Sequence, residues 1–358
     1  MMMMAPNRGE APEVVAVKAV AAIGCGYDLC YDYSFTYVKP GPDGTRLIEL
    51  DGALAHDLVL PGGVVVPNVP KSIKCDRGAR TRFRSDVVSF HQMAEQFNQF
   101  ISLTGKIPSG AFNTAFDFRG CWQKDASATK SLAFDGWNIS LYSVELVSSH
   151  IVLLDRIKQE VPSSWDPAAL AEFIEKYGTH IIAGLMMGGK DLVHMKQLKD
   201  SPLHENEVQN LLKNTVGERF DDTTNRDWND DSSRKLKDKK IENHENHTSF
   251  LDSIRSTTVP LSKKGDILCK FMRRGGIDIS QSHSKWLATI PQSPSLITMS
   301  FVPITSLLNG VKGSGFLSHA VNLYLRCKYL ISLQTSTWFI TVFSLAGETG
   351  LLQYFNST

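Results

Sequence analysis

The clearest pattern of hydrophobic and polar positions lies at residues 166–178. Asp166 is a favourable N-cap, Pro167 is a favourable first helical residue, and Gly178 is typical of a helix end. Between them the apolar side chains recur with the spacing i, i+3, i+4, i+7 of a single helical face: Leu170, Phe173, Ile174 and Tyr177. This pattern predicts a short amphipathic helix that ends at the glycine.

A long strand is predicted directly after this helix. Residues 179–187 are apolar and compatible with β structure, and they lead into Gly188 and Gly189. The alternation then resumes, with Leu192, His194 and Lys196 on one parity and Val193, Met195 and Gln197 on the other. Glycine permits torsions and close backbone approaches that other residues resist. We therefore expect the strand to bend at the two glycines.

The first hundred residues favour short strands separated by Pro and Gly turns, with one helix. That helix is predicted within residues 85–100, where apolar side chains recur roughly at helical spacing: Val88, Met93, Phe97 and Phe100. Upstream of these elements, residues 1–13 are expected to be disordered.

The next segment allows two interpretations. One parity holds apolar or small side chains, namely Phe112, Thr114, Phe116 and Phe118, whereas Asn113, Asp117 and Arg119 share the other. Such alternation suits a strand with one apolar and one polar face. The alternative is that the phenylalanines form the core side of a helix-and-turn segment. Both interpretations stay open at this point.

The second half of the chain changes composition. Residues 200–245 are rich in acidic and basic side chains and poor in aliphatic ones, so they form no core alone and are either a solvated helical excursion or partly disordered. Beyond them, residues 296–302 and 316–326 are predicted strands.

Composition and charge then limit the function. A hydrophobic fraction of 42% and a charged fraction of 21% are those of a soluble globular protein. The net charge is only +1, so no global field attracts nucleic acid or an anionic membrane, and any such contact must be local. Charged residues interrupt the apolar positions of the N-terminus, which argues against a secretory leader. We therefore expect a cytoplasmic protein that is not secreted.

The sequence offers little support for an enzyme. No pair among the six cysteines has the CxxC spacing of a zinc or redox site, and the glycines at 24 and 26 lack the third glycine of a dinucleotide-binding loop. His244 and His247 lie three residues apart without further ligands nearby, and His180 has no accompanying nucleophile motif. We expect no catalytic residue, no cofactor, no metal site and no small-molecule substrate.

The spacing between two short motifs is a more specific signal than any of these residues alone. Tyr177, Gly178, Thr179 and His180, followed by Gly188-Gly189, resemble the signature of the membrane attack complex/perforin (MACPF) family. Residues 18–28 and 273–278 are similar to the plant branch of the family, the proteins of the constitutively-activated-cell-death type. The resemblance covers about residues 14–326, which we take as the domain.

The resemblance implies an α+β fold, in which two helical clusters flank a bent, twisted antiparallel sheet. By position the clusters would be residues 85–135 and 198–260. In pore-forming members each cluster unwinds into a β-hairpin, and the hairpins of many subunits close into a membrane barrel. On this basis Phe112, Thr114, Phe116 and Phe118 are the candidate membrane-inserting strand, and Gly188 with Gly189 the candidate hinge.

The plant branch further implies a negative regulator of salicylic-acid-dependent programmed cell death in immunity. The expected partners are membrane lipid at the plasma membrane and further copies of the same chain. The alternative is a soluble interaction scaffold that has lost insertion, which the many charges of residues 221–235 favour. Residues 327–358 differ from the β-rich region expected there, and we interpret them as an atypical tail from truncation or alternative splicing.

Overall fold

The structure is a computed structural model. It describes residues 10–50, 55–120, 122–147, 151–220, 256–261, 265–277 and 282–327. Residues 221–245 of the charged segment lie outside these residues, as do both histidines of the 244–247 pair and residues 328–358 of the tail.

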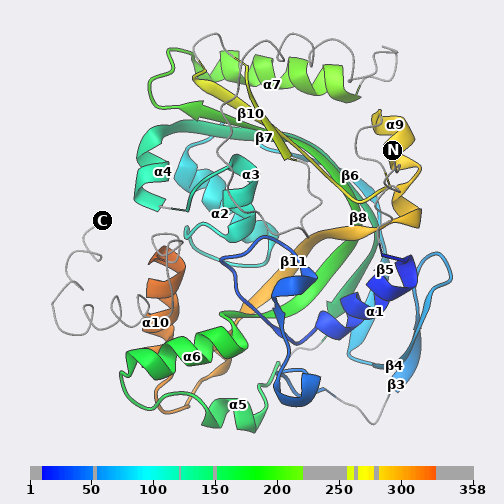
Figure 1. Cartoon of the computed structure of the whole chain (residues 1–358), viewed down its shortest axis with the longest axis vertical. Helices are drawn as coiled ribbons and strands as arrows, with labels where there is room; N and C mark the ends of the chain where they lie inside the picture. The colour runs from blue at the N-terminus through cyan, green and yellow to red at the C-terminus, as the bar shows by residue number, and fades with distance from the viewer. Residues whose placement is uncertain are drawn as a thin grey trace, which may run out of the picture.

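Within the described ranges, a curved antiparallel sheet of nine strands forms the centre of the molecule (Figure 1). Its strands are β1 (Gly26–Tyr27), β2 (Val38–Lys39), β5 (Ile73–Arg77), β6 (Arg80–Arg84), β7 (Thr129–Leu146), β8 (His180–Leu198), β9 (Ser256–Pro260), β10 (Ile267–Arg274) and β11 (Ser295–Pro303). Strand β8 pairs with β1, β7, β10 and β11, so it is the organising strand. A separate hairpin consists of β3 (Ala55–Val59) and β4 (Val65–Pro70).

Helices cover both faces of this sheet. They are α1 (Pro12–Ala22), α2 (Phe90–Phe100), α3 (Gly110–Phe116), α4 (Trp122–Ala128), α5 (Asp155–Gln159), α6 (Pro167–Tyr177), α7 (Glu205–Phe220), α9 (His283–Leu287) and α10 (Ser314–Cys327). Figure 1 shows α2, α3 and α4 inside the curve of the sheet and α7 on its outer side. The predicted α+β class, with a bent antiparallel sheet between two helical clusters, is confirmed.

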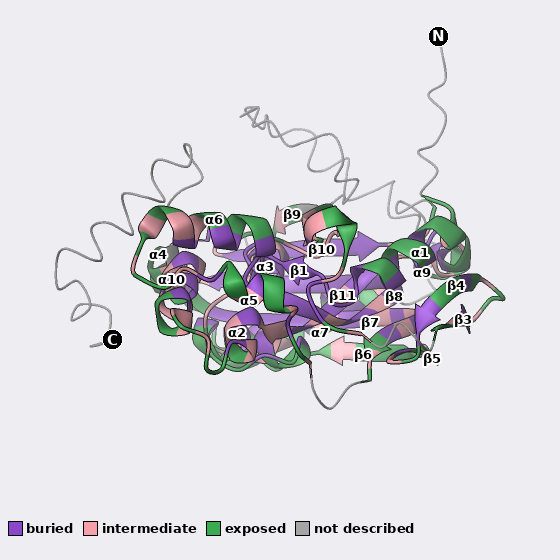
Figure 2. Cartoon of the chain, turned by 90° about the horizontal axis from the view of Figure 1, so that it is seen from below, coloured by how far each residue is buried: buried purple, intermediate pink, exposed green. Residues whose placement is uncertain are grey.

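The two sheet faces have separate cores. The inner core joins α2 and α3 to even-numbered positions of β7: Phe90, Met93, Ala94, Phe112, Ala115, Phe116, Leu132 and Phe134. The outer core joins α7 to β8, β10 and an odd-numbered position of β7: Ala133, Val193, Met195, Val208, Leu212, Val216, Ile267 and Cys269. Figure 2 shows the long central strands mostly buried, whereas the helices carry both buried and exposed parts. The twofold alternation of side chains along a strand assigns each residue to one core.

Two helices agree closely with the sequence patterns. Helix α6 has Asp166 as its N-cap, whose carboxylate accepts hydrogen bonds from two backbone N–H groups, and Gly178 ends it with φ of 79°. Helix α2 lies within the predicted range 85–100 and begins with a capping box between Ser89 and Gln92. The clusters are shorter than expected, because residues 129–135 belong to β7 and residues 256–260 to β9.

The strand interpretation of residues 112–118 is wrong for this conformation, because α3 is a helix. The Ser109 side chain caps its first turn, and Asp117 ends it in the left-handed region with φ of 55°. Phe112 and Phe116 are spaced i, i+4, which satisfies a helical face as well as an alternating strand, and both are buried. The helix-and-turn alternative therefore describes this segment.

Two further corrections concern the chain ends. Residues 316–326 were predicted as a strand, yet they lie in helix α10, where the buried side chains have helical spacing: Leu317, Ala320, Val321 and Tyr324. The tertiary contact of α10 with α6 selects this period over local β propensity. Helix α1, absent from the sequence prediction, begins at Pro12, inside the segment expected to be disordered.

Candidate functional site: the bend of strand β8

The first half of the signature lies where α6 turns into β8. The Thr179 N–H donates to the Tyr27 carbonyl (2.9 Å), and the Leu29 N–H donates to Thr179 Oγ1 (3.1 Å). A Cβ atom on Gly178 would approach the Tyr27 carbonyl oxygen to 2.6 Å. Tyr177 is fully buried against neighbouring helices. These residues therefore lock the end of α6 against β1.

His180 belongs to the same junction. Its Nδ1 lies 2.8 Å from Thr179 Oγ1, and its side chain is buried. Burial lowers the pKa of His180 to about 4, because the charged imidazolium loses hydration that the nearby Asp28 only partly replaces. The imidazole is therefore neutral at physiological pH, and its contacts are those of a residue that orients the backbone.

The second half of the signature lies at a close crossing of three backbone segments. Gly188 has φ of 153°, and a Cβ atom there would lie 2.0 Å from the Ile139 carbonyl oxygen of β7. A Cβ on Gly275, just after β10, would lie 2.4 Å from the Gly188 carbonyl oxygen. At Gly189 the nearest atoms belong to the Ile290 side chain instead. Position 188 thus requires glycine more strictly than position 189.

Strand β8 changes its partner at these glycines. Residues 180–188 pair with β11, whereas residues 190–197 pair with β10, along the edge opposite to β7. On the β7 side the register shifts between Ser140 and Tyr142, directly opposite the glycines. A bulge bends a strand and increases its twist. Gly188 and Gly189 therefore mark the point where β8 exchanges β11 for β10 and where the sheet changes direction.

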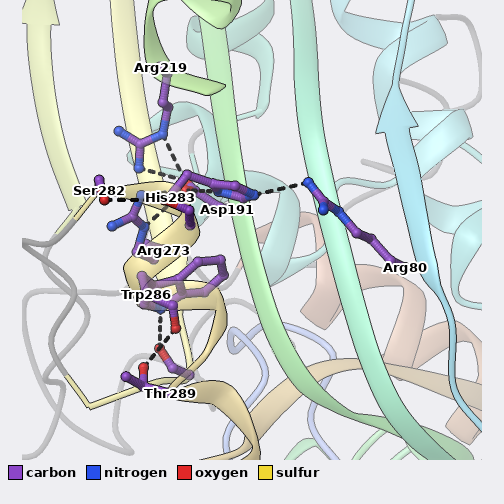
Figure 3. Close-up of polar contacts among 10 residues, drawn as sticks. Arg80, Asp191, Arg219, Arg273, Ser282, His283, Trp286 and Thr289 are labelled. Carbon is purple, nitrogen blue, oxygen red and sulfur yellow. Dashed lines mark hydrogen bonds and ion pairs between the residues drawn. The ribbon is translucent and has the colours of Figure 1, made fainter. Parts of the chain in front are cut away.

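A buried ionic cluster follows the bend on the outer face (Figure 3). Asp191 has no exposed side-chain surface, and Oδ1 accepts from Arg219 Nε (2.7 Å) of α7. Its Oδ2 accepts from Arg273 Nε (2.9 Å) of β10 and from His283 Nδ1 (3.0 Å) of α9. His283 Nε2 in turn faces Arg80 of β6 at 3.3 Å. One carboxylate therefore connects β6, β8, β10, α7 and α9.

The electrostatics of this cluster favour the ionised carboxylate. Burial alone would raise the pKa of Asp191, but Arg219, His283 and Arg273 together lower it to about 2. An arginine only donates hydrogen bonds, so the contact with Arg80 makes His283 Nε2 the acceptor and leaves Nδ1–H to donate to Asp191. Arg273 also lies 4.8 Å from the centre of the Trp286 ring. The cluster, which we call the Asp191 clamp, holds the end of α7 on the sheet.

The inner face of the same stretch carries basic side chains. Lys190 is buried and donates to the Ile297 carbonyl (3.3 Å), which lies at a register shift of β11. Lys196 donates to the Asp117 carbonyl (3.2 Å), and Lys270 donates to the Thr114 carbonyl. The last two are carbonyls at the end of α3, where cations are favourable. Sheet lysines thus help to hold α3 in place.

The arrangement of Asp191 and its partners is that of a clamp that connects strands and helices. Among the described residues no group of three His, Cys, Asp or Glu side chains lies together as metal ligands. The sequence located the glycines and the helix junction but missed the clamp of Asp191, Arg219, Arg273 and His283 on the outer face, and Lys190 on the inner face. The available signal was the Lys190-Asp191 pair inside an otherwise apolar strand, because buried charges require partners.

A comparison with known proteins decides the family. The profile of the MAC/Perforin domain (MACPF) matches residues 9–334. The chain belongs to the MACPF family. "MACPF domain-containing protein NSL1" of Arabidopsis thaliana is 53% identical over 315 residues, which are 87% of this chain and 51% of that protein. "MACPF domain-containing protein CAD1" of the same plant is 41% identical over 312 residues, 87% of this chain and 50% of that protein.

The structural comparison agrees with this assignment. The crystal structure of GNIP1Aa from Chromobacterium piscinae superposes with a TM-score of 0.54 at 14% identity, covering 87% of this chain and 56% of that one. This likeness shows the shared fold. The chain spans about half the length of the curated MACPF relatives it matches. Among the helices that the structure describes, none has both the length and the apolar character of a membrane span.

Proposed function

We propose that this MACPF chain acts at membranes by releasing its two helical clusters from the central sheet, and that copies of the chain then insert the extended segments together as a β-lined pore. The first cluster is defined here as residues 85–128, with α2, α3 and α4. The second contains α7. The role is structural rather than enzymatic.

The observation that carries this proposal is the position of the clusters in the chain. The first cluster connects β6 and β7, which already pair antiparallel, and the second follows the end of β8. Each cluster could therefore lengthen existing strands without a change of topology. In lipid, only helices and closed barrels satisfy all backbone groups, so such hairpins require assembly with other copies. Helical storage hides their edges until that assembly.

The bend supplies the second support. Gly188, Gly275 and the register shift at Ser140 concentrate close backbone contacts at a single level of the sheet. The Asp191 clamp lies just beyond it and ties α7 to β10 and α9. Release of α7 requires separation of Arg219 from Asp191. The clamp is therefore the contact that the proposed change must break on the outer face.

Dye release from vesicles tests the mechanism. Purified full chain is added at submicromolar concentration to phosphatidylcholine vesicles with and without phosphatidylserine. Leakage together with rings in electron micrographs would support the pore. Asp191→Asn should increase the rate of leakage, whereas the matched control Asp155→Asn, in an exposed pair on α5, should leave it unchanged. Circular dichroism verifies that both variants are folded.

The alternative is a soluble scaffold with the MACPF fold but without insertion. The charges at positions 221–235, which lie outside the described residues, favour it. Bound protein without leakage, or protein that never binds vesicles while keeping its fold, supports the scaffold and contradicts the pore.

We further propose that the biological role is to restrain salicylic-acid-dependent programmed cell death in plant immunity, from the cytoplasm and the inner surface of the plasma membrane. Support comes from the identity with Arabidopsis MACPF proteins and from the plant-type segments noted above. Plants without the gene should develop spontaneous lesions that enzymatic removal of salicylic acid suppresses. Plants without lesions, or lesions that persist after this removal, contradict the role.

A further inference from the structure

A cavity of about 190 Å³ lies between the inner face of the sheet and the first helical cluster. Its walls are mostly apolar and come from both sides: Phe97 and Ala115 from the helices, and Met186, Leu192 and Met272 from the strands. An apolar cavity of about 150 Å³ is large enough for benzene. The volume here suits a ring or branched chain of that size with one small polar group.

Polar side chains also line this cavity, and three of them matter for binding. Lys190 and His194 are more than nine-tenths buried, and Asn138 comes from β7. Neither His194 Nδ1 nor Asn138 Oδ1 has a hydrogen-bond partner among the described residues, although both atoms are buried. Buried polar atoms without partners are uncommon in folded proteins and call for an explanation. Their position on a cavity wall points to a ligand.

The charge balance specifies the kind of ligand. Lys190 uses one of its N–H groups for the Ile297 carbonyl and pairs with no carboxylate among the described residues. Asp32 is the carboxylate that acts electrostatically on Lys190, but it forms an ion pair with Arg274. Burial lowers the pKa of Lys190 to about 7, with Arg274 adding to the effect. An anion in the cavity would supply the missing countercharge and favour the ammonium form.

We propose that this cavity binds a small monocarboxylic acid with an aromatic or branched apolar body of about benzene size. The carboxylate pairs with Lys190, the body lies against Phe97 and Leu192, and Asn138 or His194 completes the hydrogen bonding. Helices α2 and α3 form one wall of the cavity, so the acid can stay bound only while these helices cover the sheet. The ligand therefore stabilises the closed arrangement by mass action.

Calorimetric titration of the full chain with benzoate tests the site without vesicles, so its result is independent of pore formation. Benzoate should bind more tightly than toluene or benzylamine, and dodecanoate should be excluded by its length. Lys190→Met should weaken benzoate binding by about tenfold or more. The control Lys74→Met, at an exposed position of β5 outside the cavity, should change the affinity less than twofold.

Hydrogen exchange gives a second readout. Benzoate should slow exchange of amides in α2 and α3 of the parent chain but not of Lys190→Met. The proposal is overturned if benzoate does not bind at millimolar concentration. It is equally overturned if toluene binds as tightly as benzoate, or if Lys190→Met binds benzoate as well as the parent does.

Discussion

The two faces of β8 beyond its bend hold their helices by different physics. On the outer face, Asp191 binds Arg219 of α7 through directed ion pairs in a fully buried cluster. On the inner face, α2 and α3 are held by a continuous aromatic cluster, in which Phe97 contacts both Phe112 and Phe134. Of the two buried lysines there, Lys270 lies 3.7 Å from the Asp117 carboxylate, whereas Lys190 has a carbonyl partner but no carboxylate among the described residues.

This difference predicts different modes of release. An ion-pair clamp loses its attraction once its central carboxylate is removed, because the buried positive charges around it lose the counterion that they share. An aromatic cluster is non-directional and weakens in proportion to the apolar area lost. We therefore expect α7 to respond to single charge changes, and the first cluster to respond to changes of volume or to a ligand in its cavity.

The largest expected effect is that of Asp191→Asn. Removal of the carboxylate charge takes away a buried counterion that Arg219 and Arg273 share, which should lower the free energy of unfolding by about 3–5 kcal/mol. Denaturant unfolding at neutral pH measures it. Asp155→Asn, in an exposed pair, should change stability by less than about 1 kcal/mol. Equal effects of the two substitutions would remove the distinction between clamp and surface charge.

The bend gives the next largest effect. Gly188→Ala places a Cβ atom against the Ile139 carbonyl, and we expect a loss of about 2–4 kcal/mol from crowding and backbone strain. Gly217→Ala is the control, since a Cβ there meets nothing within 4 Å in the exposed part of α7. It should stabilise the helix by about 0.5–1 kcal/mol. Thermal melts that show no difference between the two variants would contradict the close crossing at position 188.

Acid should weaken the outer face selectively. The pKa of Asp191 is lowered from 3.8 to about 2, so its contribution of about 2 kcal/mol is complete above pH 4 and is lost as the pH falls towards 2. Stability measured against pH should therefore have a smaller acid-side slope in Asp191→Asn than in the parent. Parallel profiles for the two proteins would show that the carboxylate is not held in its ionised form.

The smallest expected effect is that of Lys190→Met on the inner face, which should raise the free energy of unfolding rather than lower it. Burial lowers the pKa of Lys190 from 10.5 to about 7, so the unfolded chain binds more protons between these values and stability rises with pH. Lys190→Met removes this penalty and should stabilise the fold by about 1–2 kcal/mol near pH 7. The gain should shrink towards pH 10. A destabilised Met variant would mean that the ammonium group is well compensated.

The fold was predictable where local signals agreed. Some signals depend only on a few neighbouring residues. Asp166 and Gly178 marked the two ends of α6, and the double glycine at 188–189 marked a position within β8. The hydrophobic period was ambiguous at Phe112 and Phe116, because a spacing of four residues fits one face of a strand and one face of a helix equally. Helix α10 also escaped prediction, since its period is fixed by contact with α6.

The site was predictable only in part, for a physical reason. Asp191, Arg219, Arg273 and His283 are separated by up to 92 residues and meet only in the folded sheet. No local pattern announces such a cluster beyond the presence of charges within an apolar strand. The same holds for the cavity, whose walls include residues of α2, α3, β6, β7, β8, β10 and β11.

Hydrogen exchange on vesicles tests the central claim most directly, namely that both helical clusters leave a sheet that itself persists. The full chain is incubated with phosphatidylserine-containing vesicles, and amide protection is followed in α2 to α4, in α7, and in β7 and β8. The account predicts faster exchange at first in residues 90–128 and 205–220, while the paired amides of β7 and β8 stay protected. Leakage with both helical segments still protected, or a loss of protection throughout β7 and β8, would contradict it.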